Sequence, residues 1–267
     1  MEKFLQGEYY RLQYYIYHPD RKKTLIFFHG FDQDHTAVEP LIPYLQETRI
    51  VSLNLFGHQL SNIKIDLKEN YLKEIFNDLF EKEQLHDATL MAFSLGGKYA
   101  LKLIEVGFPV KSALLMAPDG LIKNPWYNFA TKYNLTRRLF KKFVENPEFL
   151  KPYVKWLNKM GLLNPKLKRI YETYAADRAL REKVFHVWMI HRFLEPSILS
   201  VANRIKEKKI RTHLLFGQKD VVIPPDTGKK LLKHAAPYAT AEVLPCGHQI
   251  IREENLSLIA DYIRSLA

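Results

Sequence analysis

Residues 91–97 read M-A-F-S-L-G-G, and this stretch decides the fold because it places a serine between small residues at a predicted turn. The apolar run before it predicts a strand, and K-Y-A-L-K-L-I-E at 98–105 predicts a helix. A serine on such a strand-to-helix bend projects its hydroxyl above the sheet. The turn needs small residues on either side, so Ala92 and Gly96 suit it, although glycine is usual at the first position. The stretch therefore predicts Ser94 as a nucleophile.

Strand-like and helix-like segments alternate around this turn. Short apolar runs such as T-L-I-F-F-H-G at 24–30 are typical of strands buried on both faces of a parallel sheet. Between such runs lie helical stretches, of which 67–82 has apolar residues at three- and four-residue spacing. The first 20 residues are expected to add one or two strands. The alternation predicts an α/β fold, a doubly wound and mostly parallel sheet with right-handed crossovers.

The alternation stops at Pro118 and resumes with R-T-H-L-L-F-G at 211–217. The residues between them are helix-like and broken by prolines. Because the strand pattern returns afterwards, one domain with a helical insertion explains the chain better than two successive domains. We therefore expect a core domain of residues 1–118 and 210–267, with a helical insertion at 119–209 after the sixth strand.

Positive charge and tryptophan are concentrated in this insertion. The chain of 267 residues has a formal net charge of +11, and 17 Lys/Arg against 7 Asp/Glu lie between Asp119 and Ile205. All three tryptophans lie there too. Such a segment can contact anionic lipid, an acidic substrate or nucleic acid. The competing interpretation is that its charged residues form only a solvent-exposed helix face, as most charge runs do. We see no nucleic-acid-binding motif and expect no nucleic-acid partner.

Composition indicates a globular protein of the cytoplasm. The sequence is 47% hydrophobic and 26% charged. No basic region followed by a long apolar run opens the chain, and no apolar stretch approaches the length of a membrane span. We therefore expect neither secretion nor integral membrane association. The only cysteine, Cys246, cannot form an internal disulfide, which fits a reducing compartment.

Two further residues supply what a serine nucleophile requires. Asp220 follows the strand-like run at 211–217, and His248 follows T-A-E-V-L-P at 240–245. Catalytic groups in open α/β sheets gather at the carboxyl ends of the strands, so we expect both residues to meet Ser94 there. Histidine can take the serine proton near neutral pH, and an aspartate holds the imidazole in the required tautomer.

An oxyanion formed on the substrate also needs hydrogen-bond donors. Backbone N–H groups fill this role without reorganising during the reaction. The candidates are the N–H of Leu95, which follows the nucleophile, and the N–H of Phe31 in the turn H-G-F at 29–31.

Together these motifs resemble those of the α/β-hydrolase superfamily. H-G-F matches its oxyanion loop, while G-Q-K-D-V-V-I-P at 217–224 and C-G-H at 246–248 complete the order Ser, Asp, His. N-L-F-G-H-Q-L-S at 54–61 is similar to the family's D-x-x-G-x-G-x-S turn, with Asn54 and Gln59 as departures. The resemblance covers the chain outside 119–205, which corresponds to the family's variable cap. It implies the α/β-hydrolase fold and a catalytic triad without a cofactor.

Other residues have competing interpretations. Asp119 follows a strand after which some members of this superfamily carry their acid, but D-x-x-I-P around Asp220 is the commoner family pattern. His29 and His58 flank turn glycines and are expected to hydrogen-bond the loops that shape the site.

A metal site is not expected. His186 and His191 are not spaced as a pair on one helix face and have no matching carboxylates or cysteines. Cys246 has no base arranged for it, so we expect a small buried residue.

These residues predict a serine hydrolase that cleaves a small-to-medium carboxylic ester or thioester through an acyl-enzyme. The substrate is expected to be a small molecule, either anionic or lipophilic. One alternative is a C–C bond hydrolase or lyase that uses the same triad on a carboxylated substrate held by arginines of the insertion. An alternative of another class is a non-catalytic ligand-binding protein on the same fold. No motif indicates the substrate itself or the oligomeric state.

Overall fold

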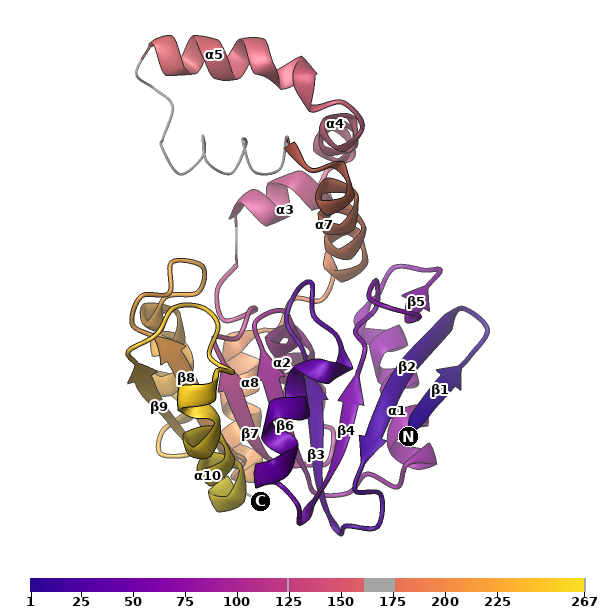
Figure 1. Cartoon of the computed structure of the whole chain (residues 1–267), viewed down its shortest axis with the longest axis vertical. Helices are drawn as coiled ribbons and strands as arrows, with labels where there is room; N and C mark the ends of the chain where they lie inside the picture. Colours follow the sequence, from indigo (N-terminus) through magenta and orange to yellow (C-terminus); the bar gives the residue numbers. More distant parts are fainter. Residues whose placement is uncertain (124, 161–175, 267) are drawn as a thin grey trace. The chain divides into compact units, whose positions relative to one another are not determined.

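The computed structural model describes residues 1–123, 125–160 and 176–266. The chain divides into two compact units, which are described separately below (Figure 1). Unit 1 comprises Met1–Lys123 and Phe193–Ala267, and unit 2 comprises Asn124–Arg192. Within the described residues, no helix combines the length and the apolar character that a membrane span requires.

Unit 1 is built on a nine-stranded sheet with the order β1-β2-β4-β3-β6-β7-β8-β9, and β5 pairs with β2 outside this path. The six strands from β4 to β9 in that order are parallel, while β1, β2 and β5 make antiparallel pairs at one side. The doubly wound, mostly parallel sheet predicted from the sequence is therefore confirmed. The strands are β1 (Glu2–Gln6), β2 (Tyr10–Tyr17), β3 (Lys23–Phe28), β4 (Thr48–Leu53), β5 (Asn62–Ile63), β6 (Ala88–Phe93), β7 (Val110–Met116), β8 (Arg211–Gly217) and β9 (Ala239–Leu244).

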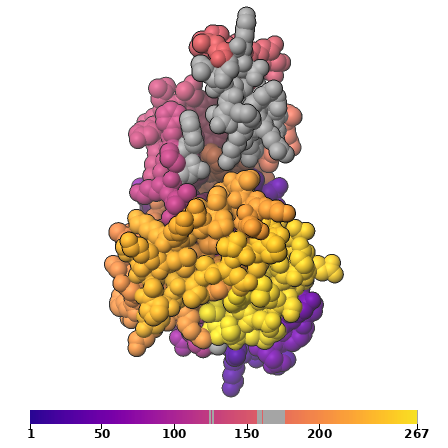
Figure 2. All heavy atoms as spheres, turned by 90° about the vertical axis from the view of Figure 1, so that its left-hand side faces the viewer, coloured from indigo at the N-terminus to yellow at the C-terminus, as the bar shows by residue number. Residues whose placement is uncertain are grey.

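Helices cover both faces of this sheet, which explains why its central strands are continuous apolar runs. All six residues of β6 are buried. On one face, η1 and α10 pack on the strands in the main hydrophobic cluster; on the other lie α1, α2 and α8 (Figure 1). In Figure 2 the orange and yellow C-terminal residues form the face of unit 1 turned to the viewer. The helices of unit 1 are η1 (His35–Tyr44), α1 (Glu69–Lys82), α2 (Gly96–Val106), α8 (Ile198–Lys208), η3 (Pro225–Gly228), α9 (Lys229–Ala235), η4 (Glu253–Asn255) and α10 (Leu256–Leu266).

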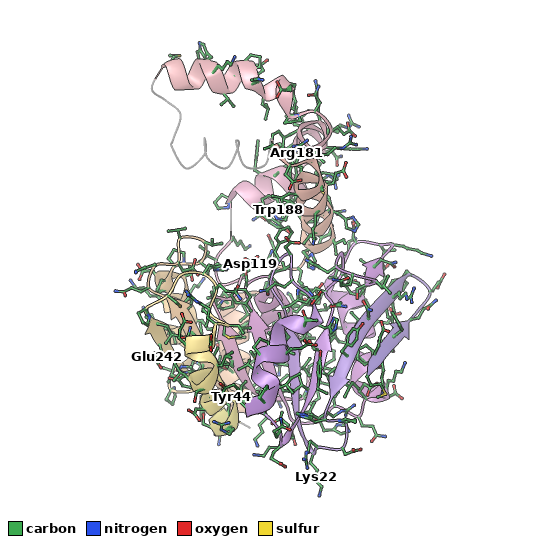
Figure 3. All side chains as sticks on the ribbon, in the orientation of Figure 1. Lys22, Tyr44, Asp119, Arg181, Trp188 and Glu242 are labelled. Carbon is green, nitrogen blue, oxygen red and sulfur yellow. The ribbon has the colours of Figure 1, made fainter. Side chains whose placement is uncertain are left out.

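Unit 2 is helical in its described residues. Aromatic rings form its interior: Trp188 of α7 lies 5.1 Å from the ring of Tyr127 and 5.6 Å from that of Phe140. Arg181, also on α7, is buried and donates through Nε to the backbone oxygen of Val144 at 3.1 Å (Figure 3). The helices of unit 2 are α3 (Pro125–Lys132), α4 (Asn134–Glu145), η2 (Pro147–Leu150), α5 (Lys151–Lys159) and α7 (Arg178–His191).

The insertion differs from the expectation in its bounds and in its place among the strands. The compact units divide after residues 123 and 192, so α8 belongs to unit 1, where it packs on α2 and α9. The insertion follows the seventh strand rather than the sixth, because the two-residue strand β5 pairs with β2. Residues 161–175 of the expected insertion lie outside the described residues. That unit 2 acts as a cap stays a prediction.

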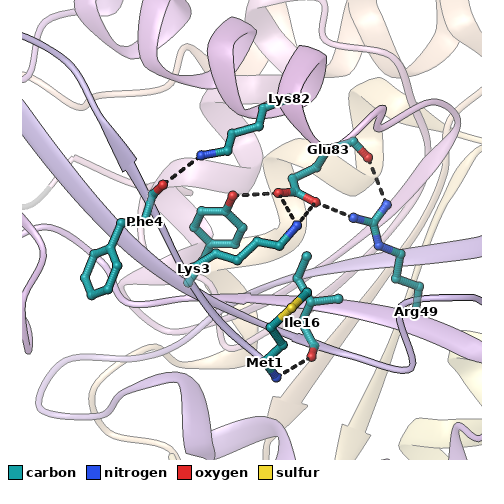
Figure 4. Close-up of polar contacts among 8 residues, drawn as sticks. Met1, Lys3, Phe4, Ile16, Arg49, Lys82 and Glu83 are labelled. Carbon is teal, nitrogen blue, oxygen red and sulfur yellow. Dashed lines mark hydrogen bonds and ion pairs between the residues drawn. The ribbon is translucent and has the colours of Figure 1, made fainter.

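A buried carboxylate joins the antiparallel side of the sheet to the end of α1. The Glu83 side chain is only 2% exposed and accepts hydrogen bonds from Lys3 Nζ at 2.9 Å, Tyr14 Oη at 2.6 Å and Arg49 Nη2 at 2.5 Å (Figure 4). Burial by itself would raise the pKa of Glu83, but the hydrogen bonds from Tyr14 and Lys3, together with the charges of Lys3 and Arg49, hold the pKa below its usual value. The ionised form is therefore the stable one in the folded protein.

We expect Glu83→Gln to lower the free energy of unfolding by about 2 kcal/mol at neutral pH, because hydrogen bonds to a charged group are lost and two cations keep no counter-ion. The pKa of Glu83 is lower in the folded state than in the unfolded state. The stabilisation that ionised Glu83 gives the folded protein is therefore complete at pH values above the unfolded-state pKa, and it is lost as the pH falls through the folded-state pKa. Urea unfolding of both proteins at several pH values measures this. Glu81→Gln, at an exposed neighbour on α1, is the control. An equal loss in both variants would contradict the prediction.

Candidate active site

Ser94 lies on the tight turn between β6 and α2, at the carboxyl edge of the sheet. Its φ is 49°, in the left-handed region that a residue with a side chain adopts only under constraint. Backbone hydrogen bonds supply the constraint. The Ser94 N–H donates to the oxygen of Met116 at 3.0 Å, and the Ser94 oxygen accepts from the N–H groups of Gly97 at 2.9 Å and Asp119 at 2.8 Å. The predicted strand-to-helix turn is confirmed.

The small residues around Ser94 are required to different degrees. A Cβ atom on Gly96 would lie 2.2 Å from the backbone oxygen of Phe28, and one on Gly97 would lie 2.4 Å from Cβ of Pro118. Both contacts are shorter than any two such atoms can tolerate, so the start of α2 packs against the end of β3 and the loop after β7 only because these residues lack side chains. Ala92 is fully buried in β6, so the position at which glycine is usual accommodates a methyl group here.

Asp220 and His248 lie on neighbouring loops that leave the carboxyl ends of β8 and β9. The two loops are joined by backbone hydrogen bonds, from Gln218 N–H to the oxygen of Leu244 at 2.8 Å and from Lys219 N–H to the oxygen of Cys246 at 2.9 Å. Pairing of β8 with β9 therefore sets the distance between the acid and the histidine.

The structure brings Ser94, His248 and Asp220 into one hydrogen-bonded chain. His248 Nδ1 lies 2.7 Å from Asp220 Oδ2, and His248 Nε2 lies 2.9 Å from Ser94 Oγ. Because a carboxylate only accepts, Nδ1 carries the hydrogen and donates it, which leaves Nε2 free to accept the Ser94 hydroxyl proton. Asp220 has a fully buried side chain, and its Oδ1 accepts from the N–H groups of Val222 at 2.7 Å and Ile223 at 2.9 Å. These bonds hold the carboxylate in place, so that Oδ2 faces His248 Nδ1 and fixes the histidine tautomer.

The two expected oxyanion donors belong to loops at the same edge of the sheet as Ser94. Leu95 comes directly after Ser94, and Phe31 follows the turn at the end of β3, the strand paired with β6. Among the described residues, neither N–H group has a hydrogen-bond acceptor. Both are therefore available to a ligand, as the oxyanion role requires.

The loop that carries Phe31 is fixed by two buried histidines. His29 Nε2 accepts from the N–H of Leu55 at 3.0 Å, so its Nδ1 carries the hydrogen and donates to the oxygen of Gly30 at 2.7 Å. Burial lowers the pKa of His29 to about 3, and the ring therefore stays neutral. His58 Nε2 accepts from the N–H of Asp32 at 3.3 Å. The prediction that His29 and His58 shape the loops is confirmed.

The competing residues have other partners. Asp119, labelled in Figure 3, accepts from the N–H of Gly120 at 2.7 Å and lies 3.6 Å from Nζ of Lys98, whereas His248 is bonded to Asp220. Cys246 is a buried free thiol, as expected. His191 is buried in unit 2, with Nδ1 2.7 Å from the backbone oxygen of Val187.

Sequence reasoning missed two residues that position the site. Gln33 Oε1 accepts from the N–H of Gly30 at 2.9 Å, and its Nε2 donates to Gln249 at 3.4 Å, which links the Phe31 loop to the His248 loop. Gly217 ends β8 at a point where the His248 loop approaches it closely. A glutamine in a polar turn and a glycine after a strand are both ordinary features, so neither gave a signal.

Comparisons with known proteins identify the fold and the family. A sequence profile described as alpha/beta hydrolase fold matches residues 23–254. The comparison with curated proteins found no match. Among solved structures, the alpha/beta hydrolase enzyme MGS-M2 from a Medee basin deep-sea metagenome library is 13% identical with a TM-score of 0.69, over 99% of this chain and 96% of that chain. A thermophilic esterase from Thermogutta terrifontis is 16% identical with a TM-score of 0.69, over 100% and 99% of the two chains.

A third structure, the esterase EaEST from Exiguobacterium antarcticum, is 17% identical with a TM-score of 0.66, over 100% of this chain and 99% of that chain. At such identities the solved structures show the common fold alone. The sequence profile, in contrast, spans most of the chain, from the start of β3 to just before the last helix, α10. The chain therefore belongs to the alpha/beta hydrolase fold family.

Proposed function

We propose that this protein is a serine hydrolase that cleaves a small-to-medium carboxylic ester or thioester through an acyl-enzyme. The observation that carries the proposal is the hydrogen-bonded chain from Ser94 through His248 to Asp220. The direction of the hydrogen bonds gives each group one role. The Ser94 hydroxyl donates, His248 Nε2 accepts, and Asp220 accepts from the opposite ring nitrogen, Nδ1.

In the first half of the proposed reaction, Ser94 Oγ attacks the carbonyl carbon of the substrate and its proton passes to His248 Nε2. The resulting oxyanion accepts hydrogen bonds from the N–H groups of Phe31 and Leu95. Collapse of this intermediate breaks the bond to the alcohol or thiol, which leaves with the proton from His248. In the second half, His248 takes a proton from water, which attacks the acyl carbon. The bond to Ser94 Oγ then breaks, Oγ receives the proton from His248, and the acid is released.

An apolar acyl group is favoured by the side chains beside the acid. Val221 and Val222 follow Asp220 directly and are 73% and 64% exposed. Exposed aliphatic side chains next to catalytic groups are typical of sites that take apolar ligands. Two of the similar structures named above are described as esterases, which also supports an ester rather than a C–C bond.

Labelling with a fluorophosphonate probe tests the proposal, because the probe phosphonylates an activated serine. We expect the wild type to gain one adduct on the peptide that contains Ser94, and Ser94→Ala to gain none. Ser257→Ala, at an exposed serine on α10, is the control and should label fully. Wild-type protein without an adduct, or Ser94→Ala with one, would contradict the proposal.

A panel of p-nitrophenyl esters and acyl thioesters of increasing chain length then identifies the substrate class. Turnover of at least one ester or thioester is expected. Full labelling without any turnover on the panel would instead favour the C–C bond alternative.

A further inference from the structure

The positive charge of the chain lies almost wholly in unit 2. Residues 124–192 contain 15 Lys/Arg and 5 Asp/Glu, in a chain whose net charge is +11. The stretch from 125 to 160, which forms α3 to α5, contains 8 Lys/Arg and only two acidic residues, Glu145 and Glu148. These two lie 3.8 Å from Lys141 and 2.8 Å from Lys151, and the stretch keeps an excess of six positive charges in its sequence (8 − 2 = 6).

Helix α5 leaves large apolar side chains exposed beside its lysines. Tyr153 and Trp156 of α5 are followed at helical spacing by Met160, the residue after the helix, whose N–H still donates to the oxygen of Trp156 at 3.0 Å. The three therefore lie along one face. They are 64%, 57% and 53% exposed. Lys151 and Lys155 belong to the other face, as the helical period requires.

Helix α4 shows the same combination. Its inner side is occupied, since Thr136 and Val144 are buried and the ring of Phe140 packs on Phe185 at 5.1 Å. Leu135 and Leu139 lie one turn apart on a different side and are 70% and 48% exposed. Three residues after each of them stands a cation, Arg138 and Lys142 respectively, so apolar and positive side chains are neighbours on this surface.

A positive groove lies between α4 and α7. Its volume is about 400 Å³, and none of the described residues that line it is acidic. Phe185 and Met189 add apolar surface to the groove. The guanidinium groups of the arginines that line it can each form a bidentate pair of hydrogen bonds with a phosphate. The lining residues are Asn134, Arg137, Arg138, Lys141, Phe185, Met189 and Arg192.

We propose that the α4–α5 surface of unit 2 binds the surface of a bilayer that contains anionic phospholipid. This surface comprises the exposed apolar residues and the cations of α4, namely Leu135, Leu139, Tyr153, Trp156, Met160, Arg137, Arg138, Lys141 and Lys142. Tryptophan and tyrosine partition to the headgroup region, and basic amphipathic helices lie in the interface with their apolar side inserted. The phosphates of anionic lipids complement the cations, and the groove between α4 and α7 has the chemistry to hold one headgroup.

Charge and side-chain type argue against the other occupants of this surface. A second copy of the chain would bring two strongly positive units together, and like charges repel. A single-stranded nucleic acid stacks its bases on aromatic rings, whereas three of the five exposed apolar residues on this surface are aliphatic or thioether side chains. A bilayer accepts both kinds of apolar side chain and supplies the opposite charge.

Co-sedimentation of the full chain with vesicles tests the proposal without any use of turnover, so it does not depend on the proposed hydrolase activity. We expect the partition coefficient to be at least about 10-fold higher on vesicles with phosphatidylserine than on phosphatidylcholine alone. Raising the salt from about 0.1 M to about 1 M should remove most of that difference, because the Debye length falls from about 10 Å to about 3 Å. Equal binding to both kinds of vesicle, or none to either, would overturn the proposal.

Matched variants locate the binding surface. Tyr153→Ala/Trp156→Ala and Arg138→Glu/Lys142→Glu are each expected to lower the partition coefficient by about 10-fold or more. Tyr44→Ala/Leu199→Ala and Lys22→Glu/Lys111→Glu make comparable changes at exposed positions of unit 1 and should leave it within about 2-fold of wild type. Circular dichroism and the thermal midpoint check that all four variants are folded. An equal loss in the unit 1 variants would overturn the proposal.

Tryptophan fluorescence gives an independent readout. Brominated phospholipid in the vesicles is expected to quench the emission of the wild type, because Trp156 is exposed on α5. Trp156→Phe should lose most of that quenching while it still sediments with the vesicles. Quenching that is unchanged in Trp156→Phe would contradict insertion of this helix and overturn the proposed surface.

Discussion

Replacing His248 by alanine is expected to lower kcat on the best ester substrate by about 10⁶-fold, the size of loss that removal of the base causes in serine hydrolases. Without His248 Nε2, which lies 2.9 Å from Ser94 Oγ, the serine hydroxyl keeps its proton near neutral pH and the leaving group receives none. The oxyanion donors on Phe31 and Leu95 remain, so a small residual rate should survive. Steady-state and single-turnover kinetics measure the loss, and adduct formation with a fluorophosphonate should fall in parallel.

Three further variants make this prediction specific. His234→Ala, at an exposed histidine on α9, should leave kcat unchanged. Asp220→Asn should lower kcat by about 10⁴-fold, because the amide no longer fixes the tautomer of His248. Asp119→Asn should cost far less, since Asp119 lies beside Lys98 rather than beside the histidine. If Asp119→Asn lowered kcat as much as Asp220→Asn does, Asp119 would be the acid of the triad. A His248→Ala variant that kept its activity would contradict the proposed mechanism.

The sheet and the site were predictable from the sequence for a shared physical reason. Strands such as β3 and β6 are buried on both faces, so they must be short apolar runs, and the residues just after them must lie at one edge of the sheet. Polar residues with chemical roles at that edge, such as Ser94, Asp220 and His248, then stand out against the apolar background.

Features that depend on tertiary contacts could not be predicted in this way, because no sequence pattern indicates them. Helix α8 has the apolar spacing of any amphipathic helix, and only its packing on α2 and α9 shows that it belongs to unit 1. Strand β5 has two residues, which is too short for any periodicity. Gln33 acts on the Phe31 loop through a side-chain contact with Gly30 that sequence spacing does not specify.

Gly217 is such a tertiary feature, and it leads to the second large effect. A Cβ atom at this position would lie 2.0 Å from the backbone oxygen of Gly247 and 2.8 Å from that of Cys246. Neither backbone oxygen can swing away as a flexible side chain would, so Gly217→Ala must move the loop itself. The residue after Gly247 is His248, and Lys219, on the loop that carries Asp220, is hydrogen-bonded to Cys246. The displaced loop therefore carries one catalytic group away from the other.

We expect Gly217→Ala to lower kcat/KM by about 10²-fold or more, because a displacement of about 1 Å in a catalytic group costs about that much. Gly247→Ala is the matched control, since a Cβ atom on Gly247 meets nothing within 4 Å and its φ lies outside the left-handed region. A methyl group added at Gly217 on β8 should thus lower activity, whereas the same group added at Gly247 on the facing loop should leave activity unchanged. Kinetics together with thermal unfolding of both variants measure this asymmetry. Equal activity in the two variants would show that the β8 contact does not hold His248 against Ser94.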